Sequence, residues 1–268
     1  VGRTGKVTPI AQLEPVELAG ATITRATLNN IDDINKKRVK IGSRVLIRRS
    51  NEVIPEILGL MEDLPGSKVI TEPEICPSCG SKLIKKGAIL TCLNREGCTE
   101  QVVDRISHFA TKQAFNIEGL STKTIEAMHT SLGLNEPSDL FKLSKEDLLT
   151  LEKVKDKKAT NILSSIEKSK NVTLEQFIYA LGIPEVGVVS ARALAKEFKT
   201  PENIMNATEE DLTRVEDIGE VIAKFILNFF SDPKNVKELE SLLNSGVKIQ
   251  EQNEANVIES EFSGKKFV

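Results

Sequence analysis

The four cysteines of this 268-residue chain all lie in one short stretch, CPSCGSKLIKKGAILTCLNREGC. They are Cys76, Cys79, Cys92 and Cys98, spaced as a C-x2-C pair, a twelve-residue hairpin-like spacer and a C-x5-C pair. This spacing lets a short chain bring four thiolates to the corners of a tetrahedron, the geometry of structural zinc. Two disulfides are the alternative, but small oxidised modules carry cysteines throughout, and nothing in the sequence indicates secretion. We predict a closed Zn²⁺ site that holds structure and performs no chemistry.

The length of 268 residues suggests two or three compact units. Aromatic residues make up 4% of the chain and Trp is absent, so the cores must be built from Ile, Leu, Val and Ala. The sequence has no membrane-spanning segment and no signal peptide, so we expect a cytoplasmic protein without a membrane partner. A net charge of −3 argues against binding a polyanion with the whole surface but leaves room for local basic patches.

Residues 1–70 are rich in β-branched residues and short apolar runs separated by Gly, Asn and Pro, with no sustained helical period. A small all-β barrel is the natural fold for so short a segment, because closure protects the strand edges. The segment also contains a run of cations with no acidic residue among them: Lys36, Lys37, Arg38, Lys40, Arg44, Arg48 and Arg49. Such a run is often a solvated face, but on a small barrel it favours nucleic-acid binding.

From Gln101 onward the sequence is typical of short helices, with apolar positions recurring every three or four residues. Ser144, Thr173 and Thr208 each precede a first turn that contains Glu or Asp, so we predict helix N-caps at these positions. The closing stretch from Asp232 to Glu261 is acidic and indicates a last helix followed by a linker.

The helical region contains an internal repeat in which a tight turn precedes a helix. The four copies are IEGLSTKTIEAM, VKDKKATNIL, IPEVGVVSARALA and VEDIGEVIAKFI, and Gly119, Gly187 and Gly219 stand in three of the turns. The second copy has Val154-Lys155-Asp156 in place of a glycine turn, so we expect this unit to pack within the protein and not to bind a ligand. Helix-hairpin-helix units of this kind offer unpaired backbone N–H groups to phosphates, which allows duplex binding without sequence readout.

Together these segments resemble one family. The order VGRTGKVTP, AQLEPVELAGATITRATLNN, IGSRVLIRRSNEVIPEI, the cysteine module and four hairpins is similar to the C-terminal two-thirds of bacterial NAD-dependent DNA ligase. The resemblance implies a multidomain fold with an all-β OB-fold barrel, a four-cysteine zinc-binding module and an all-α helix-hairpin-helix domain. The expected boundaries are 1–70 for the barrel, with 1–5 ending the adenylation domain, 71–103 for the zinc module, 104–255 for the hairpin domain and 256–268 for a linker and the start of a BRCT domain.

The resemblance further implies an enzyme that joins a 3′-hydroxyl to a 5′-phosphate at nicks in duplex DNA, during replication and repair. In this family NAD adenylates a lysine, and Mg²⁺ assists. Those groups bind mainly outside this chain, so we expect no catalytic or cofactor-binding residue within it. The fragment should bind nicked duplex as a monomer associated with the bacterial nucleoid, and it should not ligate alone.

The family motifs also imply DNA-contacting positions on the barrel. In RATLNN these are Arg25, Thr27 and Asn30, and in IRRSNEVIP they are Arg48 and Arg49. Arginine suits phosphate because its planar fork can bind two oxygens. The sequence departs from the family pattern at Asn29 and at Ser50-Asn51-Glu52, which weakens the transfer at those positions. Gly119, Gly187 and Gly219 would mark the phosphate contacts of the hairpins.

Two other functions fit part of the pattern. A non-catalytic scaffold could use the same modules to hold branched or nicked DNA, and the presence of a Lys-x-Asp-Gly motif upstream would separate it from a ligase. A zinc protein that binds single-stranded RNA would need stacking aromatics on the barrel. Residues 1–70 contain no Phe, Tyr or Trp, which argues against that third function.

Overall fold

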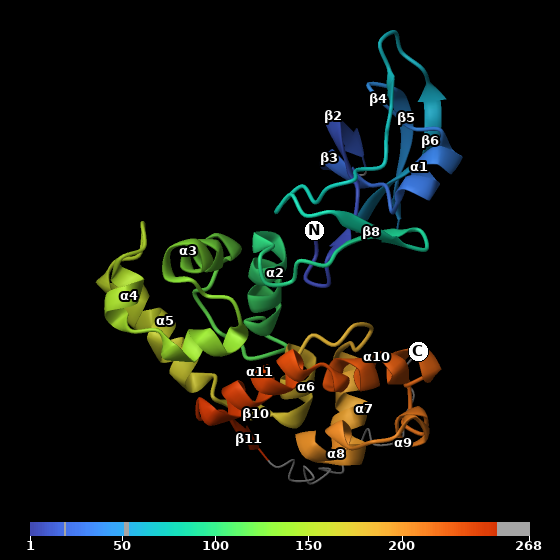
Figure 1. Cartoon of the computed structure of the whole chain (residues 1–268). Coiled ribbons are helices and arrows are strands. Elements are labelled where there is room, and N and C mark those ends of the chain that lie inside the picture. Colours follow the sequence, from blue (N-terminus) through green and yellow to red (C-terminus); the bar gives the residue numbers. More distant parts are fainter. Residues whose placement is uncertain (19, 51–53, 251–268) are drawn as a thin grey trace, which may run out of the picture. The chain divides into compact units, whose positions relative to one another are not determined.

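The structure is a computed structural model that describes residues 1–18, 20–50 and 54–250 (Figure 1). It divides into two compact units, one from Val1 to Asp104 and one from Arg105 onward, and each is described by itself. Within the described residues, no helix combines the length and apolar character needed to cross a bilayer. Residues 256–268, which were expected to form a linker and the start of a BRCT domain, lie outside the described residues.

A curled four-stranded sheet forms most of the barrel in the first unit. Its strands are β2 (Ile10–Leu18), β3 (Ala21–Thr27), β6 (Ile54–Glu62) and β5 (Arg44–Ser50), in that spatial order. The short strands β4 (Lys40–Ile41) and β7 (Lys68–Val69) pair separately. Because side chains alternate along a strand, one face can point inward, where Ala26, Leu28, Ile34, Val39 and Ile57 form the core. The predicted small OB-fold barrel is confirmed.

A helix within the barrel was not predicted. It is α1 (Ile31–Lys37), and Asn30 caps it by accepting a hydrogen bond from the Asp33 amide at 2.8 Å. Asp32 and Asp33 lie near the positive end of the helix dipole and Lys36 and Lys37 near the negative end. Part of the basic run therefore belongs to the last turn of a helix and not to a strand.

The cysteine module is built on a second, three-stranded sheet with the order β1-β9-β8. Strands β8 (Leu83–Lys86) and β9 (Ile89–Cys92) form the expected hairpin, and β1 (Lys6–Val7) from the N-terminus pairs with β9. Gly5 makes this approach possible, since a Cβ atom at this residue would lie 2.1 Å from the Cys92 carbonyl oxygen. Residues at the N-terminus thus belong to the sheet of the cysteine module.

Helices dominate the chain after Cys98, as predicted. They are α2 (Thr99–Phe109), α3 (Thr122–Leu132), the 3-10 helix η1 (Pro137–Lys142), α4 (Lys145–Leu149), α5 (Asp156–Lys168), α6 (Leu174–Ala180), α7 (Val188–Phe198), α8 (Pro201–Met205), α9 (Glu209–Thr213), α10 (Glu220–Ser231) and α11 (Pro233–Asn244). The caps predicted at Ser144, Thr173 and Thr208 are confirmed, and each forms a capping box.

A parallel strand pair was not predicted in the helical unit. Strands β10 (Asn171–Thr173) and β11 (Lys248–Gln250) pair in parallel and bring the last described residues back to the start of α6. Phe109, Phe115 and Phe177 are fully buried in this unit, so its cores are not built from aliphatic residues alone. The core beside β10 and β11 is aliphatic and includes Leu174, Ile178, Leu194, Leu212 and Ile226. This core supports the third and fourth hairpins, because Val186 and Ile218 of their turns are buried in it.

Candidate metal centre and nucleic-acid interface

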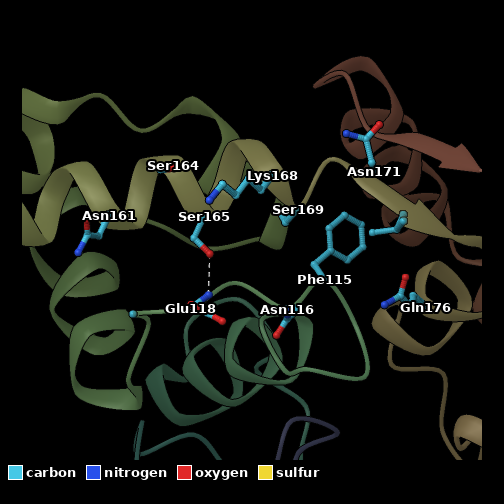
Figure 2. A pocket seen from close by; sticks show the side chains of 12 residues that line it. Phe115, Asn116, Glu118, Asn161, Ser164, Ser165, Lys168, Ser169, Asn171 and Gln176 are labelled. Atoms are coloured by element: carbon cyan, nitrogen blue, oxygen red, sulfur yellow. Dashed lines mark hydrogen bonds between the residues drawn. The ribbon is translucent and has the colours of Figure 1, made fainter.

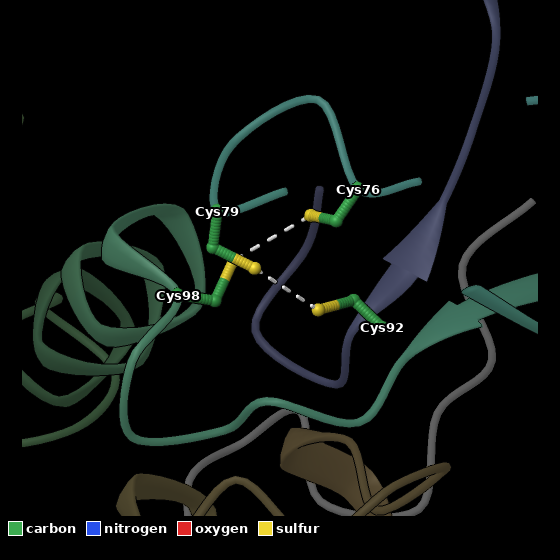
Figure 3. Close-up of side chains that lie close together, drawn as sticks. All are labelled: Cys76, Cys79, Cys92 and Cys98. Carbon is green, nitrogen blue, oxygen red and sulfur yellow. Dashed lines mark hydrogen bonds between the residues drawn. The ribbon is translucent and has the colours of Figure 1, made fainter. Parts of the chain in front are cut away.

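The sulfur atoms of Cys76, Cys79, Cys92 and Cys98 all lie within 4.8 Å of one another (Figure 3). The Sγ atoms of Cys76 and Cys98 are 3.9 Å apart, and those of Cys79 and Cys92 are 3.6 Å apart. A disulfide bond would require about 2 Å, and all four cysteines are free. Four sulfurs at about 2.3 Å from a tetrahedral zinc ion would be separated by about 3.8 Å, so the set fits that ion.

The local environment shifts the pKa values of two of the four thiols in opposite directions. The Ser81 hydroxyl, 3.3 Å from Cys79 Sγ, lowers the pKa of that thiol to about 6. Burial raises the pKa of Cys92 to about 12. Protein groups alone therefore favour a thiolate at one position and a thiol at another. A divalent cation would favour the thiolate at all four positions, because direct coordination deprotonates the sulfur.

Glycine and amide contacts fix the two cysteine knuckles. Gly80 has φ +71, and its amide donates to the Cys76 carbonyl oxygen at 2.9 Å, which closes the first turn. In the second knuckle, the amide of Gly97 donates to Asn94 Oδ1 at 3.0 Å. A Cβ atom at Gly97 would lie 2.8 Å from Asn94 side-chain atoms, so a larger residue would have to displace Asn94. Gly80 and Gly97 therefore shape the two turns that carry the cysteines.

On the barrel, the register brings Thr27, Glu56 and Arg48 into one row across strands β3, β6 and β5. Residues opposite one another in a sheet share a face, so Arg48 and Thr27 lie on the same surface, with Arg25 two residues away along β3. Arg25 and Arg48 are exposed. Arg49 is the next residue of β5 and stands opposite Pro55. The structure thus gathers Arg25, Thr27 and Arg48 on one surface.

Asn30 has a structural role that was not predicted from the sequence. Its side-chain oxygen caps α1, and its amide nitrogen is the side-chain donor that a phosphate would meet. The neighbouring Asn29 adopts φ +54 and donates from Nδ2 to Asp33 Oδ2 at 3.0 Å. Both asparagines therefore hold the connection between β3 and α1.

The four helical repeats share one backbone register in their turns. Each turn has a buried or half-buried apolar residue at its first and fourth positions, a residue with positive φ at its third position and a helix N-cap at its fifth. The turns are Ile117–Ser121, Leu151–Lys155, Ile183–Gly187 and Val215–Gly219. The third-position φ values are +85 at Gly119, +66 at Lys153, +63 at Glu185 and +63 at Asp217.

This register separates the three predicted glycines into two kinds. Gly187 and Gly219 are the N-caps of α7 and α10, where φ is −89 and −87. A Cβ atom at either residue would meet nothing within 4 Å, so the space outside the backbone is open. Among the described residues, no side chain caps either helix, which leaves the first amides directed at that space.

Gly119 is the third residue of its turn, not the fifth, and the fold restricts this position to glycine more strongly. Its φ of +85 and a Cβ contact of 3.3 Å to Ile162 Cγ1 both disfavour any side chain. Figure 2 shows Ser165 of α5 pointing toward the Glu118 backbone, whose amide donates to Ser165 Oγ at 2.7 Å. The first hairpin is thus attached to α5 beside a polar pocket of about 580 Å³. The N-cap of the first hairpin is Ser121, which accepts a hydrogen bond from the Thr124 amide.

The chain is similar to known proteins over two segments and over its whole length. Residues 1–68 match the family model of the NAD-dependent DNA ligase OB-fold domain, and residues 176–239 match the helix-hairpin-helix motif. The DNA ligase of Clostridium botulinum (strain Kyoto / Type A2) is 51% identical over 100% of this chain and 40% of its own length. DNA ligase 2 of Clostridium acetobutylicum and the DNA ligase of Clostridium perfringens are each 49% identical with the same coverage.

An OB-fold barrel, a four-cysteine module and helix-hairpin-helix turns follow one another in this chain, and the barrel matches the model of a DNA ligase domain. The barrel is of the NAD-dependent type, and the identity to bacterial DNA ligases extends over the whole chain. The chain therefore matches the C-terminal portion of bacterial NAD-dependent DNA ligases and spans 40% of the length of the relatives it matches.

Proposed function

We propose that this chain is the DNA-binding portion of an NAD-dependent ligase that seals nicks in duplex DNA. The parent enzyme would join a 3′-hydroxyl to a 5′-phosphate, with NAD and Mg²⁺ bound mainly outside these residues. The sequence contains no Lys-x-Asp-Gly motif to accept AMP, so the proposal assigns binding and orientation of DNA to these residues and no chemical step. It places the chain in the bacterial cytoplasm as a monomer.

The observation that carries the proposal is the open backbone at the third and fourth hairpins. Gly187 and Gly219 end their turns with an unobstructed approach to the first amides of α7 and α10. Such amides bind phosphate oxygens without reading base sequence. A nick can occur at any sequence, so a ligase needs contacts of this kind.

The barrel contributes the second part of the proposed interface. Arg25 and Arg48 would bind phosphates on the exposed sheet surface that also carries Thr27. No aromatic side chain stands in residues 1–70, which favours a duplex backbone over stacked single-stranded bases. Arg49 and Asn30 remain predicted contacts, the latter through its amide nitrogen.

Zinc would be held by the four cysteine sulfurs and would supply structure only. Four sulfur ligands fill a tetrahedral site and leave no position for water or substrate. The ion would join the knuckle at Cys76 and Cys79 to the end of β9 at Cys92 and to Cys98, just before α2. Its role is to fix the segment between the barrel and the helices.

Binding of nicked duplex by the purified chain tests the proposal. Fluorescence anisotropy at low ionic strength should show binding to a labelled nicked duplex. Gly187→Glu and Gly219→Glu should each weaken it at least about tenfold, because a carboxylate would occupy the space for phosphate. Lys237→Gln, an exposed change of equal charge on α11, should have little effect. Absence of binding, or equal losses in all three variants, would contradict the proposal.

The non-catalytic scaffold remains the alternative, and ligation separates the two. The full protein that contains these residues should seal a nicked duplex when NAD and Mg²⁺ are supplied. It should lose that activity, but not DNA binding, when the lysine of an upstream Lys-x-Asp-Gly motif is changed to alanine. A full protein that binds nicked DNA and never seals it would support the scaffold.

A further inference from the structure

The second hairpin carries a lysine at three alternate positions around its tip. Lys153 is the residue with positive φ, Lys155 is the N-cap of α5, and Lys157 lies in the first turn of the helix. All three side chains are exposed. None forms an ion pair with another residue in the part of the chain that the structure describes. Their charge is therefore available to a partner.

The same positions differ in the third and fourth hairpins. The third hairpin has Glu185, Gly187 and Val189 there, and the fourth has Asp217, Gly219 and Val221. These two tips present open backbone and no cation. The second tip presents three cations, and the Lys155 side chain stands where the other two have glycine. The hairpins thus share a backbone geometry but offer different chemistry.

Acidic neighbours do not cancel this charge. Asp156 lies between Lys155 and Lys157, but its carboxylate binds Lys145 Nζ at 2.7 Å. Glu152, the other acid of the turn, is exposed and pairs with no lysine within the described ranges. The tip keeps a local excess of positive charge in a unit whose other hairpin tips include Glu185 and Asp217.

A hydrogen bond extends this surface to the first hairpin. Lys158 Nζ donates to Thr124 Oγ1 at 3.2 Å, which brings the first turn of α5 next to the first turn of α3. Lys123, adjacent to Thr124, is exposed at the position equivalent to Lys157. The first turns of α3 and α5 therefore lie next to each other. We refer to the exposed lysines of these two hairpins as the lysine surface: Lys123, Lys153, Lys155 and Lys157.

We propose that this lysine surface binds DNA phosphates through side-chain charge, whereas the third and fourth hairpins bind them through backbone amides. The inference rests on the proposed DNA-binding function, and it revises the expectation that the second hairpin only packs. An ammonium group attracts phosphate over a longer range than an amide and releases counterions from DNA on binding. The two pairs of hairpins should therefore differ in their salt dependence.

The salt dependence of binding tests this division. Affinity of the full chain for nicked duplex would be measured from 50 to 200 mM salt for wild type and for K153Q/K155Q/K157Q. Each lost phosphate contact should reduce the slope of log K against log salt by about 0.9, so we expect a reduction of about 2 to 3 and a loss of at least about tenfold at the lowest salt. K153R/K155R/K157R should keep the slope because it keeps the charge.

The control removes three other exposed lysines of the same unit: Lys112, Lys196 and Lys237. K112Q/K196Q/K237Q changes the net charge equally and should leave the slope close to that of wild type. If wild type binds and the two glutamine variants have equal slopes, the proposal that the lysine surface binds phosphates is wrong, and the proposed function of the chain stands. If wild type does not bind nicked duplex at all, the proposed function itself fails.

Discussion

Arg48 on β5 and Glu56 on β6 face each other across one rung of the barrel sheet, and Arg48 Nε donates to Glu56 Oε1 at 3.0 Å. Arg48 is 58% exposed in this pair and Glu56 is 26% exposed. An exposed ion pair contributes little to stability, about 0 to 1 kcal/mol. Its larger consequence is for binding, because a DNA phosphate must compete with the Glu56 carboxylate for the same guanidinium group.

We therefore expect Glu56→Gln to tighten binding of nicked duplex. The substitution removes a negative charge beside the proposed phosphate position and releases Arg48 from its partner. A gain of about fivefold, equivalent to about 1 kcal/mol, is the expected size for one exposed pair. Titration of a labelled duplex by anisotropy measures it, and Arg48→Gln should weaken binding in the same assay.

Glu62→Gln is the matched control for this prediction. Glu62 pairs with Arg44 on the same two strands, with Arg44 Nη1 2.8 Å from Glu62 Oε2. The change in net charge is identical, but Arg44 is not one of the proposed DNA contacts. Equal tightening by both variants would show that overall charge, and not the release of Arg48, controls affinity.

Removal of the metal should unfold the cysteine module. Native mass spectrometry is expected to show one zinc ion per chain, and a strong chelator should lower the melting temperature. Structural zinc contributes on the order of 10 kcal/mol to small zinc-dependent folds, and Cys98 is completely buried. Cys98→Ser should therefore lose both the ion and the module. Ser81→Ala removes the hydroxyl contacts to Cys79 and to the Asn94 amide but no sulfur ligand, so it should retain zinc with weaker affinity.

A chain that is fully folded and metal-free in the mass spectrometer would contradict the zinc proposal. The chelator experiment keeps the test informative if Cys98→Ser fails to fold, because it uses the wild-type sequence. Recovery of the melting temperature on adding zinc, and not on adding magnesium, would identify the ion by its preference for sulfur ligands.

The hairpin turns contain strained residues, and glycine should relieve the strain. Glu185 adopts φ +63 at the third position of its turn, where the first hairpin has Gly119. A non-glycine residue in this conformation costs about 1 to 2 kcal/mol, and glycine loses about 0.5 to 1 kcal/mol of that gain through its freer unfolded state. Glu185→Gly should therefore raise the free energy of unfolding by about 0.5 kcal/mol.

Denaturant unfolding measures this change, and Glu216 supplies the control. Glu216 is also an exposed turn residue, but its φ is not positive, so Glu216→Gly should lower stability. Asp217→Gly should gain less than Glu185→Gly, because Asp tolerates the left-handed region better. A similar loss for Glu185→Gly and Glu216→Gly would show that the strain in the turn is negligible.

Much of this architecture could be predicted from the sequence because its signals are local. Thr173 with Gln176 forms a capping box within four residues, and Cys76 with Cys79 forms a knuckle within four. Helix α1 was missed because seven residues reading IDDINKK are too few to show a helical period. The β10 and β11 pair was missed because each strand has three residues and the two lie far apart in the chain.

The hairpin register shows a different limit. In a sequence, a positive φ can be predicted where a glycine stands, as at Gly119. The equivalent residues Lys153, Glu185 and Asp217 also have positive φ, but their residue types do not indicate it. The sequence pattern also made Gly119 look equivalent to Gly187 and Gly219. In the structure, Gly119 is the third residue of its turn, whereas the other two are the fifth. The apolar residues at the first and fourth positions of each turn carry the correct register, and they were the signal available in the sequence.

A half-buried carboxyl group between η1 and α11 gives the helical unit a predictable pH dependence. Glu238 accepts hydrogen bonds from the amide and the hydroxyl of Ser138, both at 2.7 Å. Burial raises the pKa of Glu238 to about 7, and the neighbouring carboxylates of Glu136 and Asp139 act in the same direction. Two cations lie in the same cluster, since Lys142 pairs with Asp139 and Arg105 pairs with Glu136.

Glu238→Gln should remove the corresponding loss of stability at high pH. Between a pKa of about 4.5 in the unfolded chain and about 7 in the folded chain, the folded state binds more protons. The free energy of unfolding of wild type therefore falls as pH rises through that window. The variant carries no titrating group there, so its stability relative to wild type should increase from pH 5 to pH 8 by on the order of 2 kcal/mol. Denaturant unfolding at both pH values measures the difference. Glu240→Gln, on the exposed side of the same helix, should show no such trend, and an identical trend in both variants would rule out Glu238 as the source.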